Sequence, residues 1–101
     1  MVTDFERRVY EKTQEIPVGF VTTYKEIARA IGRPRAFRAV GNTLNKNPTP
    51  IIVPCHRVIR SDRGVGGYAK GHKAKVELLK SEGVPIENGN VVSERIYRFK
   101  R

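Results

Sequence analysis

The chain has 101 residues, with 20 Lys and Arg against 10 Asp and Glu, and so carries a formal net charge of +10. A chain of this length can form one domain with a modest core, and we expect residues 1–101 to be a single domain. The one cysteine cannot form an internal disulfide, the charged residues near the N-terminus do not fit a secretory signal, and no apolar run approaches the roughly 20 residues that cross a bilayer. We therefore expect an intracellular protein, cytoplasmic or associated with the nucleoid of a prokaryote, that is not secreted and has no membrane partner.

The first third of the sequence predicts two helices. Apolar residues recur at helical spacing from residue 4 to 15, so we expect a first helix that ends before Pro17. Thr23 and Glu26 have the spacing of a capping box, in which each side chain bonds the backbone N–H of the other residue. A second helix is therefore expected to begin at Thr23.

A third helix of about residues 34–46 is predicted to follow directly. Gly32 is a helix stop, and Pro34 suits the first position of a new helix. Two short helices joined by a glycine-containing turn form the helix-turn-helix pattern, here with a second helix that is basic at its start. The pattern is typical of DNA-binding domains, although three-helix units without a DNA function share it.

The segment around the single cysteine is predicted to be irregular. Three branched apolar residues, 51–53, indicate a short buried extended segment before Cys55, and we expect residues 56–59 to form one helical turn. Four glycines between residues 60 and 71 indicate a basic loop or wing rather than a regular element.

A fourth helix of about residues 72–82 is predicted next. Ile86, the turn-like Asn88-Gly89-Asn90, and the alternating Ile96 and Phe99 then predict a small terminal hairpin. The predicted fold class is mainly α with small β elements. We expect a winged-helix-like helix-turn-helix domain, in which a three-helix DNA-binding bundle is followed by one further helix and a terminal hairpin.

The basic surplus is concentrated on both sides of Cys55. Residues 24–46 and residues 56–75 each contain six basic side chains and one acidic side chain, whereas the other residues carry equal numbers of both signs. Clustered positive charge of this kind indicates a polyanionic partner, in particular a nucleic acid. The alternative is a generally solvated basic surface, which would spread the surplus evenly along the chain.

Cys55 is either a small buried hydrophobe or a reactive thiol, and composition and spacing leave both open. A thiol needs a nearby base or positive charge to ionise at neutral pH, and His56 and Arg57 follow Cys55 directly. Neighbouring side chains on an extended backbone point in opposite directions, so deprotonation by His56 requires a tight turn or an intervening water. One cysteine and two histidines without ligand spacing do not predict a metal site.

The motif Pro54-Cys55-His56-Arg57-Val58 resembles the active-site motif of the O6-alkylguanine-DNA alkyltransferases, also named methylated-DNA–protein-cysteine methyltransferases. Further segments resemble this family in order and spacing: FVTTY at 20–24, RAVG at 38–41, NPTPI at 47–51, VGGY at 65–68 and LLKSEG at 78–83. The resemblance covers about residues 3–84, which correspond to the catalytic C-terminal domain of that family, and leaves residues 85–101 as a tail.

The resemblance implies a DNA-binding mode. The helix of about residues 34–46 would dock in the minor groove of duplex DNA, and the alkylated guanine would be turned out of the stack into a pocket. Arg38 would take the place of the extruded base, and Tyr24 would crowd its phosphate. The alternatives are a phosphate contact for Arg38 and a core aromatic for Tyr24. Further DNA contacts are expected at Thr23, Arg35, Ala39, Gly41, Asn42, Arg57 and Gly66.

The resemblance also implies the chemistry. Cys55 would attack the carbon attached to O6 and keep the alkyl group as a thioether, so one molecule would repair one lesion. His56 would act as base through a bound water, and Glu82 would orient that histidine. Tyr68 would donate its hydroxyl proton toward the purine, and Asn47 would brace the turn. No cofactor is implied, because the DNA itself is the alkyl donor. From the residues alone, a solvated helix-end carboxylate would be the preferred interpretation of Glu82.

The sequence departs from the family pattern in three respects. Many members carry a separate domain ahead of this unit, and we expect the chemistry to be complete without it, with stability and pocket closure affected. Ala69 stands where some relatives have a hydroxyl residue. Terminal hairpins occur in the alkyltransferase-like proteins, which bind alkylated guanine without repairing it, but those proteins typically have tryptophan at the position of Cys55.

Three functional hypotheses follow. The first is a monomeric DNA-repair protein that acts on double-stranded DNA containing O6-alkylguanine and is consumed in one turnover. The second is a non-catalytic protein that binds the lesion and recruits other repair factors. The third is a general winged-helix DNA-binding protein with a structural cysteine.

Overall fold

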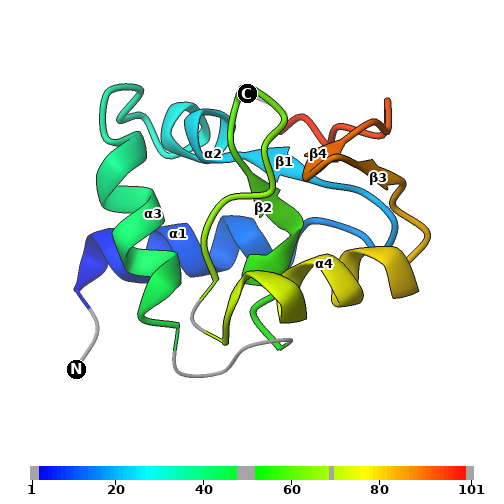
Figure 1. Ribbon diagram of the computed structural model, residues 1–101. Coiled ribbons are helices and arrows are strands. Elements are labelled where there is room, and N and C mark those ends of the chain that lie inside the picture. The colour runs from blue at the N-terminus through cyan, green and yellow to red at the C-terminus, as the bar shows by residue number, and fades with distance from the viewer. Residues whose placement is uncertain (1–2, 48–51, 69, 100–101) are drawn as a thin grey trace.

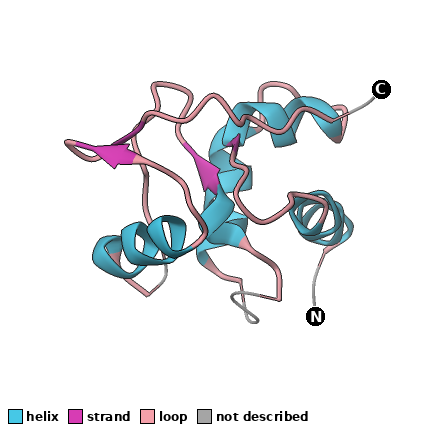
Figure 2. Cartoon of the chain, turned by 90° about the vertical axis from the view of Figure 1, so that its right-hand side faces the viewer, coloured by secondary structure: helices cyan, strands magenta, loops and turns pink. Residues whose placement is uncertain are grey.

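Helices and short strands alternate along the computed structural model, which describes residues 3–47, 52–68 and 70–99. The elements are α1 (Asp4–Gln14), β1 (Thr22–Thr23), α2 (Tyr24–Ala30), α3 (Phe37–Asn45), the 3-10 turn η1 (Cys55–Arg57), β2 (Val58–Ile59), α4 (His72–Ser81), β3 (Ile86–Glu87) and β4 (Asn90–Val91) (Figure 1). The expected class, mainly α with small β elements, is confirmed (Figure 2). Within the described ranges, no helix has both the length and the apolar character that a membrane span needs.

The first helix, α1, is stabilised at its start by a capping box. The hydroxyl of Thr3 accepts from the backbone of Glu6, and the Glu6 carboxylate accepts from the backbone of Thr3. Val9 and Thr13 face the interior one turn apart, as the apolar spacing predicted. The predicted first helix is therefore confirmed.

The predicted capping box of α2 is only half formed. The hydroxyl of Thr23 accepts from the backbone N–H of Glu26 at 3.0 Å. The Glu26 carboxylate does not return the bond in the described structure but pairs with Arg29 and, at 3.5 Å, with Arg98. A carboxylate that is only 7% exposed needs cationic partners, and these compete with the capping geometry.

The turn between α2 and α3 confirms the predicted stop at Gly32. The N–H of Arg33 bonds the carbonyl of Ala28, and the N–H of Gly32, at φ +77°, bonds that of Arg29, which is a Schellman motif. The prediction that the third helix starts near Pro34 is wrong, because residues 34–36 form turns and α3 begins at Phe37.

The predicted helical turn at residues 56–59 is also wrong in its position. The 3-10 turn η1 occupies Cys55–Arg57, and Val58 and Ile59 form β2, which pairs in parallel with β1. Both residues of β2 are β-branched and have no exposed surface, so they suit a buried strand. Their partners, Thr22 and Thr23, lie 36 residues earlier in the chain.

The tail contains a hairpin whose turn lies at the predicted Asn88-Gly89 and whose first strand begins at Ile86, but its second strand ends at Val91, before Ile96. The strands β3 and β4 pair around Asn88 and Gly89, both of which have positive φ, as a tight hairpin turn requires. Ile96 instead forms a parallel bridge with Val21, and Phe99 packs into the core. The prediction that both belong to a terminal hairpin is wrong.

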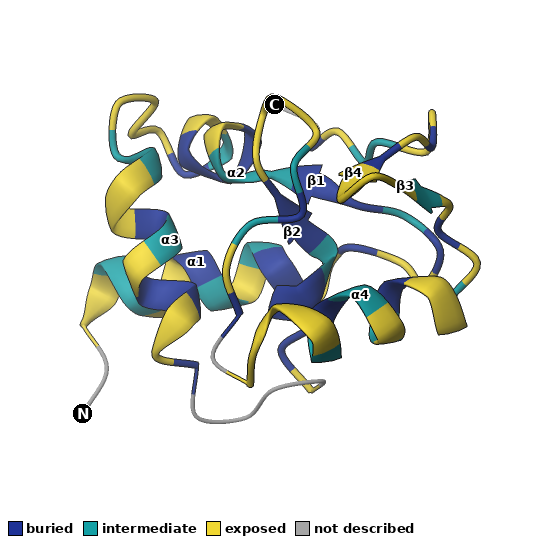
Figure 3. Ribbon diagram, viewed as in Figure 1, coloured by how far each residue is buried: buried dark blue, intermediate teal, exposed yellow. Residues whose placement is uncertain are grey.

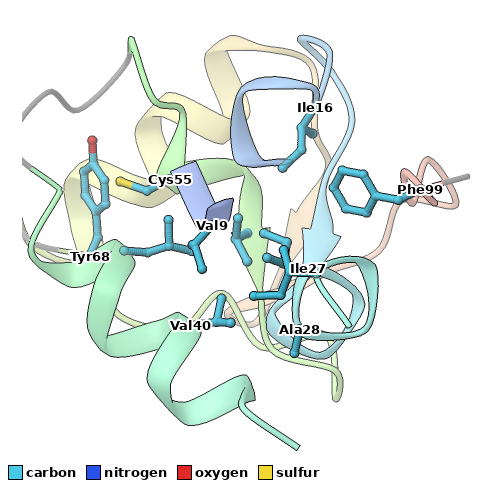
Figure 4. Close-up of a cluster of buried hydrophobic side chains, with 11 residues drawn as sticks. Val9, Ile16, Ile27, Ala28, Val40, Cys55, Tyr68 and Phe99 are labelled. Atoms are coloured by element: carbon cyan, nitrogen blue, oxygen red, sulfur yellow. The ribbon is translucent and has the colours of Figure 1, made fainter. Parts of the chain in front are cut away.

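Two clusters of buried side chains hold these elements together. Buried residues occur in each of the helices α1 to α4 and in β1 and β2 (Figure 3). The first cluster lies among α1, α2 and α3 and extends to Cys55, Tyr68 and Phe99 (Figure 4). The second joins Val21 and Ile59 of the strand region to Leu79 of α4 and to the tail. Cys55 thus lies at the boundary between the helix-turn-helix bundle and the rest of the chain.

We predict that Phe99→Ala lowers the free energy of unfolding by about 3 kcal/mol, because it deletes a ring that is 7% exposed and packs edge-on against Tyr97. Chemical denaturation measures the change. Val92→Ala, at a position of the same tail that is 47% exposed, is the control and should change stability by less than about 0.5 kcal/mol. Equal effects of the two substitutions would contradict this packing of the tail.

Candidate active site and DNA-binding surface

A pocket of about 690 Å³ opens between the helix-turn-helix bundle and the glycine-rich loop. Its volume lies within the range of about 300 to 1,000 Å³ that is typical of small-molecule sites. Six of the predicted site residues line it: Cys55, Tyr68, Tyr24, Gly41, Asn42 and Gly66. The remainder of the lining is Leu44, Asn45, Arg60, Gly64, Val65, Gly67, His72 and Gly89.

Two glycines flank Tyr24, and the close packing requires glycine at one of them, Gly66. Gly66 has φ +82°, and a Cβ atom on it would lie 3.0 Å from the hydroxyl oxygen of Tyr24. On the other side, a Cβ atom on Gly41 would lie 3.9 Å from the Tyr24 ring. Tyr24 therefore projects between α3 and the glycine-rich loop, and a larger residue at position 66 would displace it.

Cys55 and Tyr68 meet at one edge of the first core cluster, where the sulfur faces the tyrosine ring (Figure 4). Cys55 is only 5% exposed. Burial raises the pKa of Tyr68, and negative charge on Cys55 raises it further. The Tyr68 hydroxyl is buried and has no hydrogen-bond partner among the described residues. The tyrosine is therefore a neutral donor at neutral pH, beside the thiol.

His56 and Glu82 form a hydrogen-bond contact that lies outside the pocket lining. Nε2 of His56 lies 2.9 Å from Oε2 of Glu82, while Nδ1 is buried and has no partner among the described residues. Burial lowers the pKa of His56, against the opposing effect of Glu82. Burial would raise the pKa of Glu82, but hydrogen bonds from Arg57 and His56 outweigh it and lower that pKa. Glu82 is thus an ionised carboxylate at the C-cap of α4 with defined partners, not a solvated helix end.

Arg57, predicted to contact DNA, has its guanidinium turned inward. Nε and Nη2 donate to the two oxygens of Glu82 at 3.0 and 2.9 Å. Nη1 donates to the carbonyl of Ile16 at 2.8 Å, and the side chain is 12% exposed.

Asn47 connects the end of α3 to the cysteine turn. Its amide donates to the carbonyl of Val53 at 2.8 Å, and the same carbonyl accepts the backbone N–H of Cys55 at 2.7 Å. The residues of the NPTPI motif that follow Asn47, and Ala69, lie outside the described residues.

The remaining predicted DNA contacts lie on or near the outer side of α3. Arg38, Ala39 and Asn42 are exposed, whereas Val40 and Leu44 of the same helix are buried. Arg35 is exposed in the turn before α3, and Thr23 is half-buried as the N-cap of α2. None of Arg35, Arg38, Ala39 and Thr23 lines the pocket.

Comparison with known proteins places this arrangement in a family. The family model described as "6-O-methylguanine DNA methyltransferase, DNA binding domain" matches residues 4–84. The chain belongs to the 6-O-methylguanine DNA methyltransferase family. It is 56% identical over 80 residues to the methylated-DNA–protein-cysteine methyltransferase of Methanosarcina barkeri, a match that covers 79% of this chain and 51% of that protein. The chain thus spans about half the length of the curated relatives it matches.

Two solved structures illustrate the range of family members. Mycobacterium tuberculosis OGT in complex with DNA matches with a TM-score of 0.79 and 46% identity, over 81% of this chain and 51% of that one. S. pombe Atl1 in complex with damaged DNA containing O6-carboxymethylguanine matches with a TM-score of 0.84 and 34% identity, over 97% of this chain and 99% of that one. The first match ends short of the whole chain, whereas the second includes the tail.

The family motifs did not lead us to Lys75, which the structure places inside the site. Its side chain has no exposed surface, and Nζ lies 2.7 Å from the carbonyl of Val58, 3.0 Å from that of Gly67 and 3.4 Å from the Tyr24 hydroxyl. Burial lowers the pKa of Lys75 to about 8, opposed by negative charge on Cys55. A signal was available in the sequence, because Lys75 lies one helical turn before Leu79, on the inward stripe.

Among the described residues, no group of three or more His, Cys, Asp and Glu side chains is arranged to hold a metal ion. Lys75 instead organises this region through its three hydrogen-bond donors, which join β2, the glycine-rich loop and Tyr24.

We predict that the stability difference between wild type and Lys75→Met changes with pH. Between about pH 8 and the ordinary lysine value of 10.5, the unfolded chain retains the proton of Lys75 and the folded chain has lost it. The free energy of unfolding of the wild type, minus that of the variant, should therefore rise across this window by on the order of 1–3 kcal/mol. Denaturation at a series of pH values measures it, with Lys73→Met, at an exposed position of α4, as the matched control. A difference that stays constant would contradict a buried, titrating Lys75.

Proposed function

We propose that this chain repairs DNA by transferring the alkyl group of an O6-alkylguanine to Cys55. One observation carries the proposal: the single thiol lines a pocket of about 690 Å³ beside Tyr68. The next residue, His56, contacts Glu82 through Nε2, and its Nδ1 has no partner among the described residues. A neutral tyrosine donor, a histidine base and a thiol are the groups that such a transfer needs.

DNA binding is assigned to the outer side of α3. Arg38, Ala39 and Asn42 are exposed there, and Asn42 also lines the pocket, so this surface continues into the site. We propose that α3 lies in the minor groove, that Arg38 fills the space of the extruded base, and that Tyr24 presses on its phosphate. The complexes of M. tuberculosis OGT with DNA and of S. pombe Atl1 with damaged DNA support the DNA-binding part of this proposal.

The proposed transfer balances without a cofactor. The sulfur of Cys55 bonds to the alkyl carbon as the bond from that carbon to O6 breaks, and the electron pair of the broken bond stays on the guanine. The thiol proton passes through a bound water to Nδ1 of His56, and Tyr68 gives its hydroxyl proton to the leaving purine. Tyr68 then regains a proton from His56. The product is guanine and a stable thioether, so each molecule acts once.

A second candidate function is lesion binding without transfer. It is favoured by the match to S. pombe Atl1, which extends over 97% of this chain, tail included, and 99% of that chain. Cys55 favours transfer instead, since alkyltransferase-like proteins typically have tryptophan at that position.

Intact mass spectrometry separates the two candidates. After incubation with a duplex oligonucleotide containing O6-methylguanine, we expect the protein to gain the mass of one CH2 group, on the peptide that contains Cys55. The gain should reach one group per molecule and stop, and Cys55→Ala should abolish it while the variant still binds the oligonucleotide. Tight binding to the damaged duplex with unchanged mass would support the second candidate.

We also predict that Arg38→Ala slows transfer from duplex DNA about tenfold more than transfer from a free O6-alkylguanine base, because only the duplex reaction requires extrusion of the base. Rates of Cys55 alkylation by the two substrates measure the effect. Arg38→Lys is the matched control, since a simple phosphate contact would be restored by either cation. Equal slowing on both substrates would contradict the extrusion role.

A further inference from the structure

All three nitrogens of the Arg57 guanidinium donate to acceptors inside the protein. Two of its nitrogens hold both carboxylate oxygens of Glu82, and the third donates to the carbonyl of Ile16, beyond the end of α1. With 12% of the side chain exposed, a DNA phosphate would have to break this arrangement to reach the charge. The contacts of Arg57 therefore connect it to Glu82 and, through Glu82, to His56.

We propose that Arg57 is a positioning residue, which holds Glu82 so that His56 stays an uncharged base with Nδ1 as its acceptor nitrogen. The inference rests on the proposed function in one respect, which is that His56 takes the proton of Cys55. It adds a residue that acts through Glu82 and touches neither the thiol nor the substrate.

The hydrogen bond to Glu82 selects the tautomer of His56. An ionised carboxylate only accepts, so Nε2 of His56 must carry the proton across the 2.9 Å contact. Nδ1 then holds the lone pair, and it is the nitrogen that is buried without a partner among the described residues. This arrangement requires Glu82 to be ionised and fixed in orientation, and the two-pronged contact from Arg57 supplies both conditions.

Burial contributes most to keeping the ring of His56 neutral, and the neighbouring charges modify its pKa. Glu82, from the end of α4, favours the imidazolium, whereas Arg57 of η1 and Lys75 of α4 disfavour it, and burial disfavours it most strongly. Tyr68 presents a ring edge at a centroid distance of 6.4 Å, and Cys55 precedes His56 on η1. Without Arg57, the full charge of Glu82 would act on His56, and the histidine would bind a proton at a higher pH.

Arginine is suited to this place in a way that lysine is not. Its planar fork contacts both carboxylate oxygens and still has a third nitrogen free to donate to Ile16. That third bond fixes the fork relative to the segment after α1. A lysine would retain the positive charge but lose the fork geometry. The Arg57→Lys and Arg57→Gln substitutions therefore separate the effect of the charge from that of the geometry.

The titration of His56 tests the proposal directly in the free protein, by NMR of the histidine ring nitrogens. We expect Arg57→Gln to raise the pKa of His56 by about 1 unit or more, and Arg57→Lys to raise it by less. The acid limb of the pH profile for alkylation of Cys55 should move to higher pH by the same amount. His72→Gln assigns the signals, and Arg7→Gln, which removes an exposed arginine paired with Asp4 and Glu11 on α1, is the matched control.

Several results would overturn the proposal. If the His56 titration is unchanged in a folded Arg57→Gln variant, Arg57 has only a structural role. If the titration is unchanged and DNA binding is weaker and less salt-dependent, Arg57 is a phosphate contact. If both variants fail to fold, the wild type alone decides, because a His56 that is cationic at pH 7, or protonated on Nδ1, excludes the mechanism. The titration does not depend on transfer, so loss of the proposed function, seen as unchanged mass with alkylated DNA, is a separate outcome.

Discussion

The parallel pairing of β1 with β2 joins the two halves of the site (Figure 1). Tyr24 follows directly after β1, and Cys55 begins the turn that ends at β2, so two paired residues fix the tyrosine relative to the thiol. A pairing this short is stabilised by its surroundings rather than by its own hydrogen bonds. Val58 and Ile59 are fully buried, and Lys75 donates to the carbonyl of Val58 and toward the hydroxyl of Tyr24. Lys75 therefore reinforces the same junction from α4.

Charge in this chain has two separate uses, which the sequence does not distinguish. The block of residues 56–75 contains six basic side chains, but Arg57 and Lys75 face inward, toward Glu82 and toward backbone carbonyls. Each is a buried cation that is costly to desolvate and is retained where it has defined acceptors. Fewer basic side chains of this block are therefore available to contact a polyanion than its net charge indicates. The inward cations instead surround His56 and Cys55, and so act on the electrostatics of the site.

Local patterns predicted the elements whose stabilising contacts are local. The bounds of α1 and the stop at Gly32 depend on neighbouring residues, and both were predicted. The strand β2 and the bridge of Ile96 to Val21 depend on partners far away in the sequence, and both were missed, since two residues carry no usable periodicity. In the site, the resemblance indicated Glu82, which the residues alone would have left solvated. The resemblance did not indicate that Arg57 and Lys75 turn inward. The helical spacing of Lys75 from Leu79 is the one signal of it in the sequence, and it is outweighed because a charged side chain in a basic block is ordinarily solvated.

The tail matters to the site although the family model ends at residue 84. In the described residues between β2 and α4, the loop that carries Tyr68 forms no helix or strand, so other segments must hold it. The hairpin of β3 and β4 does so: Val91 bonds the carbonyl of Arg63, Asn90 bridges to Gly64, and the N–H of Val65 bonds the carbonyl of Gly89, which itself lines the pocket. A wall held in this way depends on residues outside the family match, and the longer relatives, matched over about half their length, need not share it. A segment outside the family match therefore holds residues 63–65 of the loop that leads to Tyr68, the residue proposed to donate a proton beside Cys55.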